Sequence, residues 1–413
     1  MSKLTTDILI VGGGPAGMSA AVGASQKDGT KITVVDDNPH LGGQIWRADL
    51  GKIKSAEAQE LIALLEQQKI SILNNAAVFA RTGNALHVET PSGKIEIEYK
   101  KLILATGARE RFLPFPGWTL PNVFGAAGLQ ALVKGGLNIQ DKRVVVAGTG
   151  PLLLVVAEYL ASKGARIAAI CEQASNKKLD RFALGLWRWP SKIAQGISLK
   201  AKLRSIPYYR NSWITAANGE SLLHSVTVKR LNKTEVIECE MLACGFHLVP
   251  NTELAQLFGC SILDGFVAVD DFQETSIPNI FSAGEPTGIG GVEAAVVEGK
   301  IAGLAAIEEW DRARALFKVR HRTSTFAKAL DRTFELREEL KSLASSSTFV
   351  CRCEDVQYGK LTEFGDFRMA KLQTRCGMGA CQGRICGAAV EFLFGWKDRS
   401  VRPPIFPVKM ENL

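Results

Sequence analysis

Five of the chain's nine cysteines lie between residues 351 and 386, and their spacing could hold a metal. Cys351 and Cys353 are two positions apart, so on an extended segment both thiols point to the same side. Cys381 and Cys386 supply a second pair after 27 intervening residues. Cys376 and Cys381 have the same separation as that pair, so spacing alone does not choose between them. An odd total of nine cysteines does not suit a disulfide framework, and a metal centre is the better interpretation.

The glycines near these cysteines and the C-x-C spacing bear on which metal is bound. Gly377, Gly379, Gly383 and Gly387 free the backbone to wrap closely, and their N–H groups could hydrogen-bond to sulfur and tune a reduction potential. Zinc sites usually pair their ligands as C-x2-C to C-x4-C, so the C-x-C pair argues against zinc without excluding it. Zinc, an iron–sulfur cluster and a fold that has lost its metal are the three alternatives.

A second group of residues has the types and spacing of a dinucleotide site. Gly12, Gly14 and Gly17 form G-x-G-x-x-G between the apolar run DILIV and a segment of small residues. The first glycine permits a tight turn, the second lets a pyrophosphate approach the backbone, and the third lets helix and strand lie close together. Phosphate charge would sit at the N-terminus of the following helix, which begins with Pro15 and Ala16.

Further turns along the chain extend this predicted site. Asp36, nineteen positions after Gly17, is placed to accept hydrogen bonds from a ribose, and Asp37 follows it. The segments LGGQIW (41–46), ILATGARE (103–110) and FSAGEP (281–286) are three more glycine turns.

Taken in this order, the motifs resemble the two-dinucleotide-domain flavoprotein superfamily of disulfide and NADH-dependent reductases, over about residues 5–305. The resemblance implies FAD in the first domain. In that superfamily the last motif usually ends in Gly-Asp, whose carboxylate meets the flavin ribityl chain, and here the longer Glu285 stands in its place. Besides Gly12, Gly14, Pro15, Ala16 and Gly17, the predicted cofactor-binding residues are Asp36, Asp37, Gly43, Gln44, Ala105, Thr106, Gly107, Gly284 and Glu285.

The usual redox partners of such a flavin are missing from the sequence. A disulfide reductase needs a pair such as C-x-x-C, and none of Cys171, Cys239, Cys244 or Cys260 offers that spacing, so these are expected to be buried structural cysteines. A second glycine loop, GTGPLL (148–153), has leucine where the third glycine belongs, although Glu172 stands where a ribose-binding acid would. The departure predicts a retained scaffold that binds no NAD.

The cysteine-rich segment has a resemblance of its own. CRCEDV (351–356) and TRCGMGACQGRIC (374–386) resemble the bacterioferritin-associated-ferredoxin type of 2Fe-2S domain. The family form G-M-G-x-C-Q-G-R-x-C implies that Cys381 and Cys386 are ligands together with Cys351 and Cys353, and Cys376 is left over.

The elements that must position these residues follow from hydrophobic periodicity. Residues 7–37 and 142–172 each read as a buried strand, a glycine turn, a helix and a second strand, so the chain contains two βαβ units. The predicted fold class is α/β, with two Rossmann-like domains of the disulfide-reductase type and a small C-terminal 2Fe-2S domain. The predicted divisions are an FAD-binding domain (1–115, returning at 246–310), a second nucleotide-binding-type domain (116–245), a helical linker (311–345), a 2Fe-2S domain (346–395) and an extended tail (396–413).

Composition and charge exclude several other classes. The 413 residues are 46% hydrophobic, and no apolar run reaches the roughly 18 to 20 residues that a membrane helix needs. The N-terminus runs almost directly into a strand, leaving no room for a signal peptide, so a cytoplasmic location is expected. The net charge of +8 comes without a nucleic-acid recognition motif, and nucleic-acid binding is not expected. The basic segment 166–210 is either a solvated face or a docking surface for an acidic partner protein.

As a whole, the chain resembles the A subunits of opine oxidases such as octopine and nopaline oxidase, and the B subunits of hydrogen cyanide synthase and the alpha subunits of proline and hydroxyproline dehydrogenases are relatives. The resemblance implies that a separate beta subunit, itself a flavoprotein of the amino-acid-oxidase type, oxidises the substrate's C–N bond while this chain collects the electrons. It also implies that such complexes can carry FMN at the contact between subunits, that some add a small third subunit, and that electrons leave towards a respiratory-chain acceptor, which would place the chain at the inner membrane's periphery. No catalytic acid or base is expected in this chain.

Two other classes of function remain open from the sequence. A self-contained NAD(P)H-dependent reductase would need the loop at 148–153 to bind nicotinamide despite its leucine. A non-catalytic scaffold would organise the oxidising partner chain and would tolerate disruption of Gly14 or Cys381.

Overall fold

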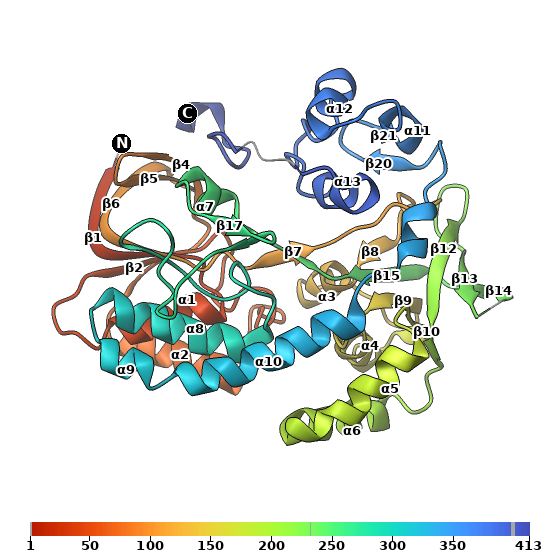
Figure 1. Ribbon diagram of the computed structural model, residues 1–413, viewed down its shortest axis with the longest axis horizontal. Helices are drawn as coiled ribbons and strands as arrows, with labels where there is room; N and C mark the ends of the chain where they lie inside the picture. The colour runs from red at the N-terminus through yellow and green to blue at the C-terminus, as the bar shows by residue number, and fades with distance from the viewer. Residues whose placement is uncertain (1, 232, 398–400) are drawn as a thin grey trace. The chain divides into compact units, whose positions relative to one another are not determined.

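The computed structural model describes residues 2–231, 233–397 and 401–413 and divides the chain into two compact units. Unit 1 comprises Met1–Arg109, Pro250–Ala327 and Ser400–Leu413, and unit 2 comprises Glu110–Val249 and Lys328–Arg399. The chain passes between them through β7 (Ala108–Glu110) and β16 (Leu248–Pro250), which pair as a two-stranded ribbon, and again within helix α10 (Phe317–Phe334) (Figure 1). No described helix is long and apolar enough to span a membrane.

Unit 1 is built on a sheet with strand order β3-β2-β1-β6-β5-β4, and β19 lies beside β6. Its strands are β1 (Ser2–Val11), β2 (Ile32–Val35), β3 (Ser71–Leu73), β4 (Ala77–Thr82), β5 (Ala85–Thr90), β6 (Gly93–Leu104) and β19 (Ile280–Ser282). Strands β3, β2, β1, β6 and β19 are parallel, whereas β4, β5 and β6 pair antiparallel. Parallel strands bring their carboxyl ends to one edge, so the turns that follow β1, β2, β6 and β19 meet there.

Two helices rich in small residues cover one face of this sheet. Helix α1 (Pro15–Ala24) crosses α8 (Gly291–Ala306) at very short range. A Cβ atom added to Gly299 would lie 2.1 Å from the Ala16 carbonyl oxygen, and one added to Gly303 would lie 2.1 Å from that of Ala20. Glycine is therefore required at both positions, and this close contact fixes the glycine turn that precedes α1. Helix α2 (Ala56–Gln67), α7 (Glu253–Leu257), α9 (Trp310–Arg314) and β17 (Ile262–Leu263) with β18 (Phe266–Val267) complete the unit.

Unit 2 contains a parallel sheet with strand order β11-β10-β9-β15-β8. Its strands are β8 (Val123–Gly125), β9 (Arg143–Thr149), β10 (Arg166–Glu172), β11 (Tyr208–Arg210) and β15 (Met241–Phe246), and its helices are α3 (Ala126–Lys134), α4 (Leu152–Ser162), α5 (Asn176–Gly185), η1 (Leu186–Arg188) and α6 (Pro190–Lys202). An antiparallel sheet of β12 (Ser212–Asn218), β13 (Ser225–Arg230) and β14 (Lys233–Glu238) follows. Apolar side chains from the strands of both sheets are buried in one core, which includes Val145, Cys171 and Val226.

A small C-terminal subdomain belongs to unit 2 and has a core of its own. It comprises β20 (Phe349–Cys351), β21 (Val356–Gln357), α11 (Tyr358–Leu361), α12 (Phe367–Thr374) and α13 (Cys386–Phe394), preceded by η2 (Glu338–Ser342). Val350, Leu361, Phe367 and Val390 are buried together with three of the cysteines. The tail of the chain is counted to unit 1, where the Ile405 N–H donates to the Phe79 carbonyl, and it ends in η3 (Met410–Asn412).

Candidate functional site

The first glycine turn in unit 1 leaves no room for a side chain at Gly12 or Gly17. Gly12 has φ +108°, and a Cβ there would lie 2.1 Å from the Ala105 carbonyl oxygen. A Cβ on Gly17 would lie 1.8 Å from the Gly12 carbonyl oxygen, so α1 can approach β1 only with glycine at this position. Gly14 caps α1 without a side-chain hydrogen bond, and the nearest atom to a Cβ placed there is the Gly43 Cα at 3.8 Å. The first N–H groups of α1 therefore have no side-chain cap, an arrangement that suits a phosphate.

Asp36 stabilises this turn from the end of β2. Its carboxylate is 5% exposed, and one oxygen accepts a hydrogen bond from the Gly13 N–H. The other oxygen accepts from the Asn38 N–H at 2.7 Å and from the Asn38 side-chain amide at 2.9 Å. The neighbouring predicted residues lie at the surface, where Asp37 accepts from the Asn38 amide at 2.7 Å and Gln44 accepts from Arg47 at 3.0 Å.

The turn after β6 is held by Asn251, which belongs to none of the sequence motifs. The Thr106 hydroxyl donates to the Asn251 carbonyl at 2.6 Å, and the Asn251 side-chain amide donates to the Thr106 carbonyl at 2.9 Å. Gly107 follows with φ +66°, and a Cβ there would lie 3.8 Å from a carboxylate oxygen of Glu285. The structure therefore brings the ends of β6 and β19 together in unit 1.

Glu285 is the one carboxylate of this group that lacks an internal partner. Burial raises its pKa, and among the described residues its carboxyl has no hydrogen-bond partner. The adjacent Gly284 has φ +80°, and a Cβ there would lie 2.9 Å from the Ala16 Cβ. An unpaired carboxyl beside two glycine turns is available to accept hydrogen bonds from a bound hydroxyl group.

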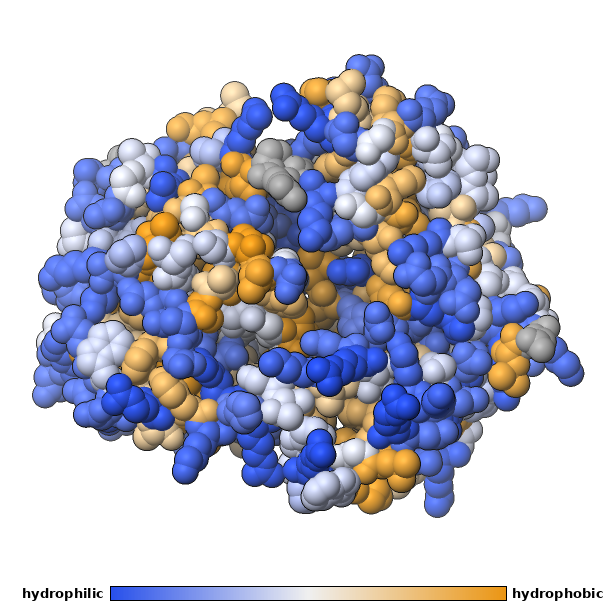
Figure 2. All heavy atoms as spheres, viewed as in Figure 1, coloured by the Kyte–Doolittle hydropathy of each residue, from blue (hydrophilic) through white to orange (hydrophobic). Residues whose placement is uncertain are grey.

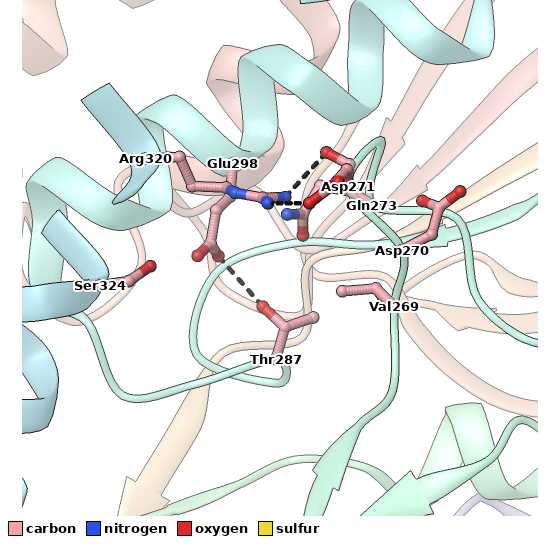
Figure 3. A pocket seen from close by; sticks show the side chains of 8 residues that line it. All are labelled: Val269, Asp270, Asp271, Gln273, Thr287, Glu298, Arg320 and Ser324. Atoms are coloured by element: carbon pink, nitrogen blue, oxygen red, sulfur yellow. Dashed lines mark hydrogen bonds and ion pairs between the residues drawn. The ribbon is translucent and has the colours of Figure 1, made fainter. Parts of the chain in front are cut away.

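A second buried acid, Glu298 on α8, supports the same turn from behind. Its carboxylate accepts from the Gly284 N–H at 2.9 Å and from the Thr287 hydroxyl at 3.0 Å, and burial raises its pKa to about 7. It also lines a polar cavity of about 500 Å³ together with Val269, Asp270, Asp271, Gln273, Thr287, Arg320 and Ser324 (Figure 3). Arg320 is paired there with Asp271 at 2.5 Å. An acid within the small-residue helix GVEAAVVEGK was the only sequence signal for Glu298.

The second glycine turn, in unit 2, is closed by its own side chains. Gly150 donates its N–H to Glu172 at 2.8 Å, and the same carboxylate accepts from the Thr149 hydroxyl at 3.1 Å and the Ala174 N–H at 2.8 Å. Glu172 is 1% exposed, and burial raises its pKa to about 7. Leu153 is accommodated because the neighbouring strand carries Gly245, whose added Cβ would lie 3.4 Å from the leucine Cδ2.

A segment of the chain crosses the carboxyl ends of β9, β10 and β15, and we name residues 334–337 the strap. The Phe334 carbonyl accepts from the Thr149 hydroxyl at 3.0 Å, from His247 Nε2 at 2.6 Å and from the Gln173 amide at 3.4 Å. The Glu335 carbonyl accepts from the same Gln173 amide at 3.0 Å. In doubly wound folds a dinucleotide binds in the crevice outside these strand ends, so the strap lies where that ligand would.

Arg337 and Phe334 anchor the two ends of the strap. The Arg337 N–H donates to the Gln173 side-chain oxygen at 3.2 Å, and its guanidinium donates to Asn211 at 3.1 Å and stacks 3.6 Å above the Trp213 ring. The Phe334 ring meets that of Phe182 edge to face, with 5.5 Å between centroids. The second crevice is thus filled by hydrogen bonds and ring contacts within unit 2.

The four predicted ligands of the C-terminal subdomain line one cavity. Cys351, Cys353, Cys381 and Cys386 surround about 210 Å³ together with Phe112, Trp118, Arg352 and Ile385. Cys351 ends β20, Cys386 begins α13, and the other two lie on the loops that follow β20 and α12. Strand, loops and helix therefore bring both pairs to the same hollow.

Cys376 adds a fifth sulfur beside this cavity. Its Sγ and those of Cys351 and Cys386 all lie within 4.8 Å of one another, and the three residues are buried. Hydrogen bonds from the Cys376 and Cys386 thiols hold the pKa of Cys351 well below its usual value. Cys376 does not appear among the residues that line the cavity.

Glycines and a tryptophan shape the walls of the cavity. A Cβ on Gly379 would lie 2.3 Å from the Cys353 Cβ, and Gly377 and Gly383 have φ +84° and +77°. These positions let the loop 375–385 close over the C-x-C pair. On the other side, Trp118 donates its indole N–H to the Phe349 carbonyl at 2.6 Å, and the Arg352 guanidinium lies 5.4 Å from its ring centroid.

The remaining cysteines lie apart from both sites. Cys171, Cys239, Cys244 and Cys260 are buried, and burial raises the pKa of each. Thiols of this kind are weak nucleophiles.

Comparisons with known proteins agree with these motifs. Residues 6–299 match the pyridine nucleotide-disulphide oxidoreductase family. The hydrogen cyanide synthase protein HcnB of Pseudomonas aeruginosa is 32% identical over 92% of this chain and 90% of its own length. The A subunit of opine oxidase from Agrobacterium tumefaciens is 29% identical over 98% of this chain and 91% of its own length.

Solved structures share the fold at lower identity. L-proline dehydrogenase from P. horikoshii has a TM-score of 0.70 and 20% identity, covering 100% of this chain and 80% of that one. T. acidophilum thioredoxin reductase has a TM-score of 0.56 and 21% identity, covering 74% of this chain and 98% of that one. The two-domain Rossmann-type α/β architecture predicted from the sequence is thereby confirmed for the larger part of the chain.

Proposed function

The chain belongs to the pyridine nucleotide-disulphide oxidoreductase family, in the group of opine oxidase A subunits and HcnB, and from this premise we propose that it is an electron-transfer subunit carrying FAD and a 2Fe-2S cluster. The complex would oxidise the C–N bond of an opine or a related amino acid. The observation that carries the proposal is the presence, within one chain of this family, of a dinucleotide-type glycine turn with an uncapped helix N-terminus and of a cavity lined by four cysteines.

The residues of unit 1 fit FAD. Gly12 and Gly17 let β1, β6 and α1 approach closely, and Gly14 leaves the N-terminus of α1 without a side-chain cap, which supports pyrophosphate binding by the backbone. Asp36 would hold the adenosine ribose and Glu285 the ribityl hydroxyls, since the first lies at the end of β2 and the second has an unpaired carboxyl. Thr106 and Asn251 would keep the loop that faces the ring system in place.

The residues of the C-terminal subdomain fit a 2Fe-2S cluster. Four thiols around one cavity supply the ligand number that such a cluster needs, and Phe112, Trp118 and Ile385 give the cavity an apolar wall. Bound together, flavin and cluster would allow a two-electron donor to be coupled to a one-electron acceptor, because a flavin exchanges one or two electrons and the cluster one. The chain's own part is to bind, orient and shield the two groups.

The names of the relatives support the inference that this chain acts together with a partner protein. HcnB and the opine oxidase relative are both named as subunits, and the chain spans about nine tenths of each. We infer a flavoprotein beta subunit of the amino-acid-oxidase type that oxidises the substrate, FMN at its contact with this chain, and in some complexes a small third subunit. A respiratory-chain acceptor would take the electrons, which places the complex in the cytoplasm at the periphery of the inner membrane.

The position of the strap supports the inference that the electron donor of this chain is not NAD(P)H. A nicotinamide dinucleotide could enter the second crevice only if the hydrogen bonds of Thr149, Gln173 and His247 to residues 334 and 335 were broken. A self-contained NAD(P)H-dependent reductase is therefore the weaker alternative.

The test is reduction by substrate with and without the partner. The chain is purified alone and after co-expression with a candidate beta subunit of the amino-acid-oxidase type, and each preparation is mixed anaerobically with octopine, nopaline or proline. We expect one of these substrates to bleach the flavin absorbance of the complex and to leave the isolated chain oxidised. A Cys381→Ala complex should still be bleached but should lose most of its turnover with a one-electron acceptor. Unchanged turnover in that variant would favour the scaffold alternative.

A further inference from the structure

Nearly all of the chain's excess positive charge comes from one short segment. Residues 176–204 contain eight lysines and arginines and a single acid, Asp180, for a net charge of +7 against +8 for the whole chain. Subtracting these from totals of 50 basic and 42 acidic residues leaves 42 and 41 for the other 384 residues, which are close to neutral. A basic excess this local is a property of one surface rather than of the protein as a whole.

The segment folds as a helical hairpin in which only Trp189 and Leu203 are buried. It comprises α5, η1 and α6, and none of residues 176–188 and 190–202, all of which the structure describes, is buried. Three large apolar side chains on it are mostly exposed: Leu184 by 79%, Trp187 by 70% and Ile197 by 64%. Figure 2 shows hydrophobic residues next to strongly hydrophilic ones over these helices. A surface helix ordinarily buries its apolar side chains, so this hairpin has apolar surface left to cover.

Several of the basic side chains also lack an acidic partner. Lys178 and Lys202 form ion pairs with Glu335 and Glu158, and Arg188 lies 5.5 Å from the centroid of the Trp187 ring. Among the described residues, no ion pair is formed by Lys177, Arg181, Lys200 or Arg204. The positive charge of the hairpin is thus available to an external anion.

We propose that the α5–η1–α6 hairpin binds the surface of an anionic phospholipid bilayer. Helices that lie in a membrane interface combine lysine and arginine with exposed tryptophan and leucine, and tryptophan prefers the headgroup level. Five of the eight cations are lysines, and lysine is depleted at the centre of protein–protein interfaces, so the composition favours lipid phosphates over a partner protein. Leu184, Trp187 and Ile197 enter the headgroup layer, and the cations neutralise phosphate. This surface does not depend on either cofactor.

The test uses the full chain and vesicles of stated composition. Co-sedimentation is measured with vesicles of phosphatidylcholine alone and of equal parts phosphatidylcholine and phosphatidylglycerol. We expect binding to the anionic vesicles only, and weaker binding at high salt because exposed charges are screened. The variant K177E/R181E/K200E should bind at least about tenfold more weakly, since each cation contributes separately to attraction by the surface.

Two further variants test whether vesicle binding depends on the hairpin itself and not on the net charge of the chain. The control K52E/K360E/R368E makes the same change in net charge at exposed positions elsewhere and should bind as the unaltered chain does. Replacing Leu184, Trp187 and Ile197 by serine should also weaken binding, while the far-ultraviolet circular dichroism of every variant stays unchanged. Equal binding to both vesicle types, equal loss in the control, or a hairpin variant that keeps vesicle binding and loses the beta subunit instead would each overturn the proposal.

Discussion

Cys376 lies within 4.8 Å of two predicted ligands, yet it does not line the cavity that the other four cysteines surround. We therefore predict that Cys376→Ala keeps about two iron atoms per chain after anaerobic reconstitution, as a 2Fe-2S cluster requires. Cys381→Ala should lose at least half of that iron, because a cavity ligand is missing. Iron and acid-labile sulfide assays check this.

The same pair of variants can reverse the ligand assignment. Full iron content in Cys381→Ala together with loss of iron in Cys376→Ala would show that Cys376 is a ligand. Cys381 and Cys386 would then not bind the cluster as a pair. Zinc in place of iron in both would contradict the cluster itself.

We predict that the buried acid Glu172 makes the free energy of unfolding depend on pH. Burial raises its pKa in the folded chain to about 7 from an ordinary 4.5. Between these values the folded state holds a proton that the unfolded state has released, so the free energy of unfolding falls as pH rises from about 4.5 to 7 and then levels off. The shift corresponds to about 3 kcal/mol from this residue.

The variant Glu172→Gln removes the titrating group. It should lose about 1–3 kcal/mol at pH 5, because its amide nitrogen would face the Gly150 N–H in place of an accepting oxygen. Its melting temperature should then fall less steeply between pH 5 and 8 than that of the unaltered chain, with Glu298 accounting for part of what remains. The exposed Glu363→Gln is the matched control. An equal slope in all three proteins would contradict the role given to Glu172.

Among the elements, the strap is the feature that most restricts function. The Gln173 side chain forms three hydrogen bonds to the strap, with Phe334, Glu335 and Arg337, and a fourth to Thr149 beside it. We predict that Gln173→Ala lowers the free energy of unfolding by about 2–4 kcal/mol, because buried donors and acceptors lose partners. Urea unfolding measures this, and the exposed Gln195→Ala should change stability little. A Gln173→Ala protein as stable as the unaltered chain would mean that the strap is not held as described.

The glycine turns could be predicted from sequence because their cause is local. Gly12, Gly17 and Gly148 are required by atoms that the same βαβ unit, or the strand next to it, brings close. The strap could not be predicted, since the bond from Gln173 to Phe334 joins residues 161 positions apart and neither carries a motif. Asn251 was missed for the same reason, because it holds a turn 145 positions away in the chain. Glu298 lies only 14 positions from Gly284, but it stands outside the glycine motif that it supports.

At the scale of the whole molecule, the two proposed cofactor sites lie in different units, and each unit supplies all the residues of its own proposed site. The cysteine pairs could be read from the sequence because C-x-C and C-x4-C are local spacings. That all four line one cavity depends on Gly379 and on the fold of the subdomain, which spacing does not specify. The basic segment was also visible in the sequence, but only the structure shows that its helices leave Leu184, Trp187 and Ile197 exposed.

Anaerobic absorbance and EPR spectroscopy of the purified chain, with metal analysis, test the central claim most directly. We predict a bound-flavin spectrum with iron, no bleaching on addition of NADH, and a rhombic EPR signal that appears only after dithionite is added. Rapid bleaching by NADH would contradict the closed second crevice and establish a self-contained reductase. Zinc without iron, or flavin without any EPR signal after dithionite, would contradict an electron-transfer subunit that carries both groups.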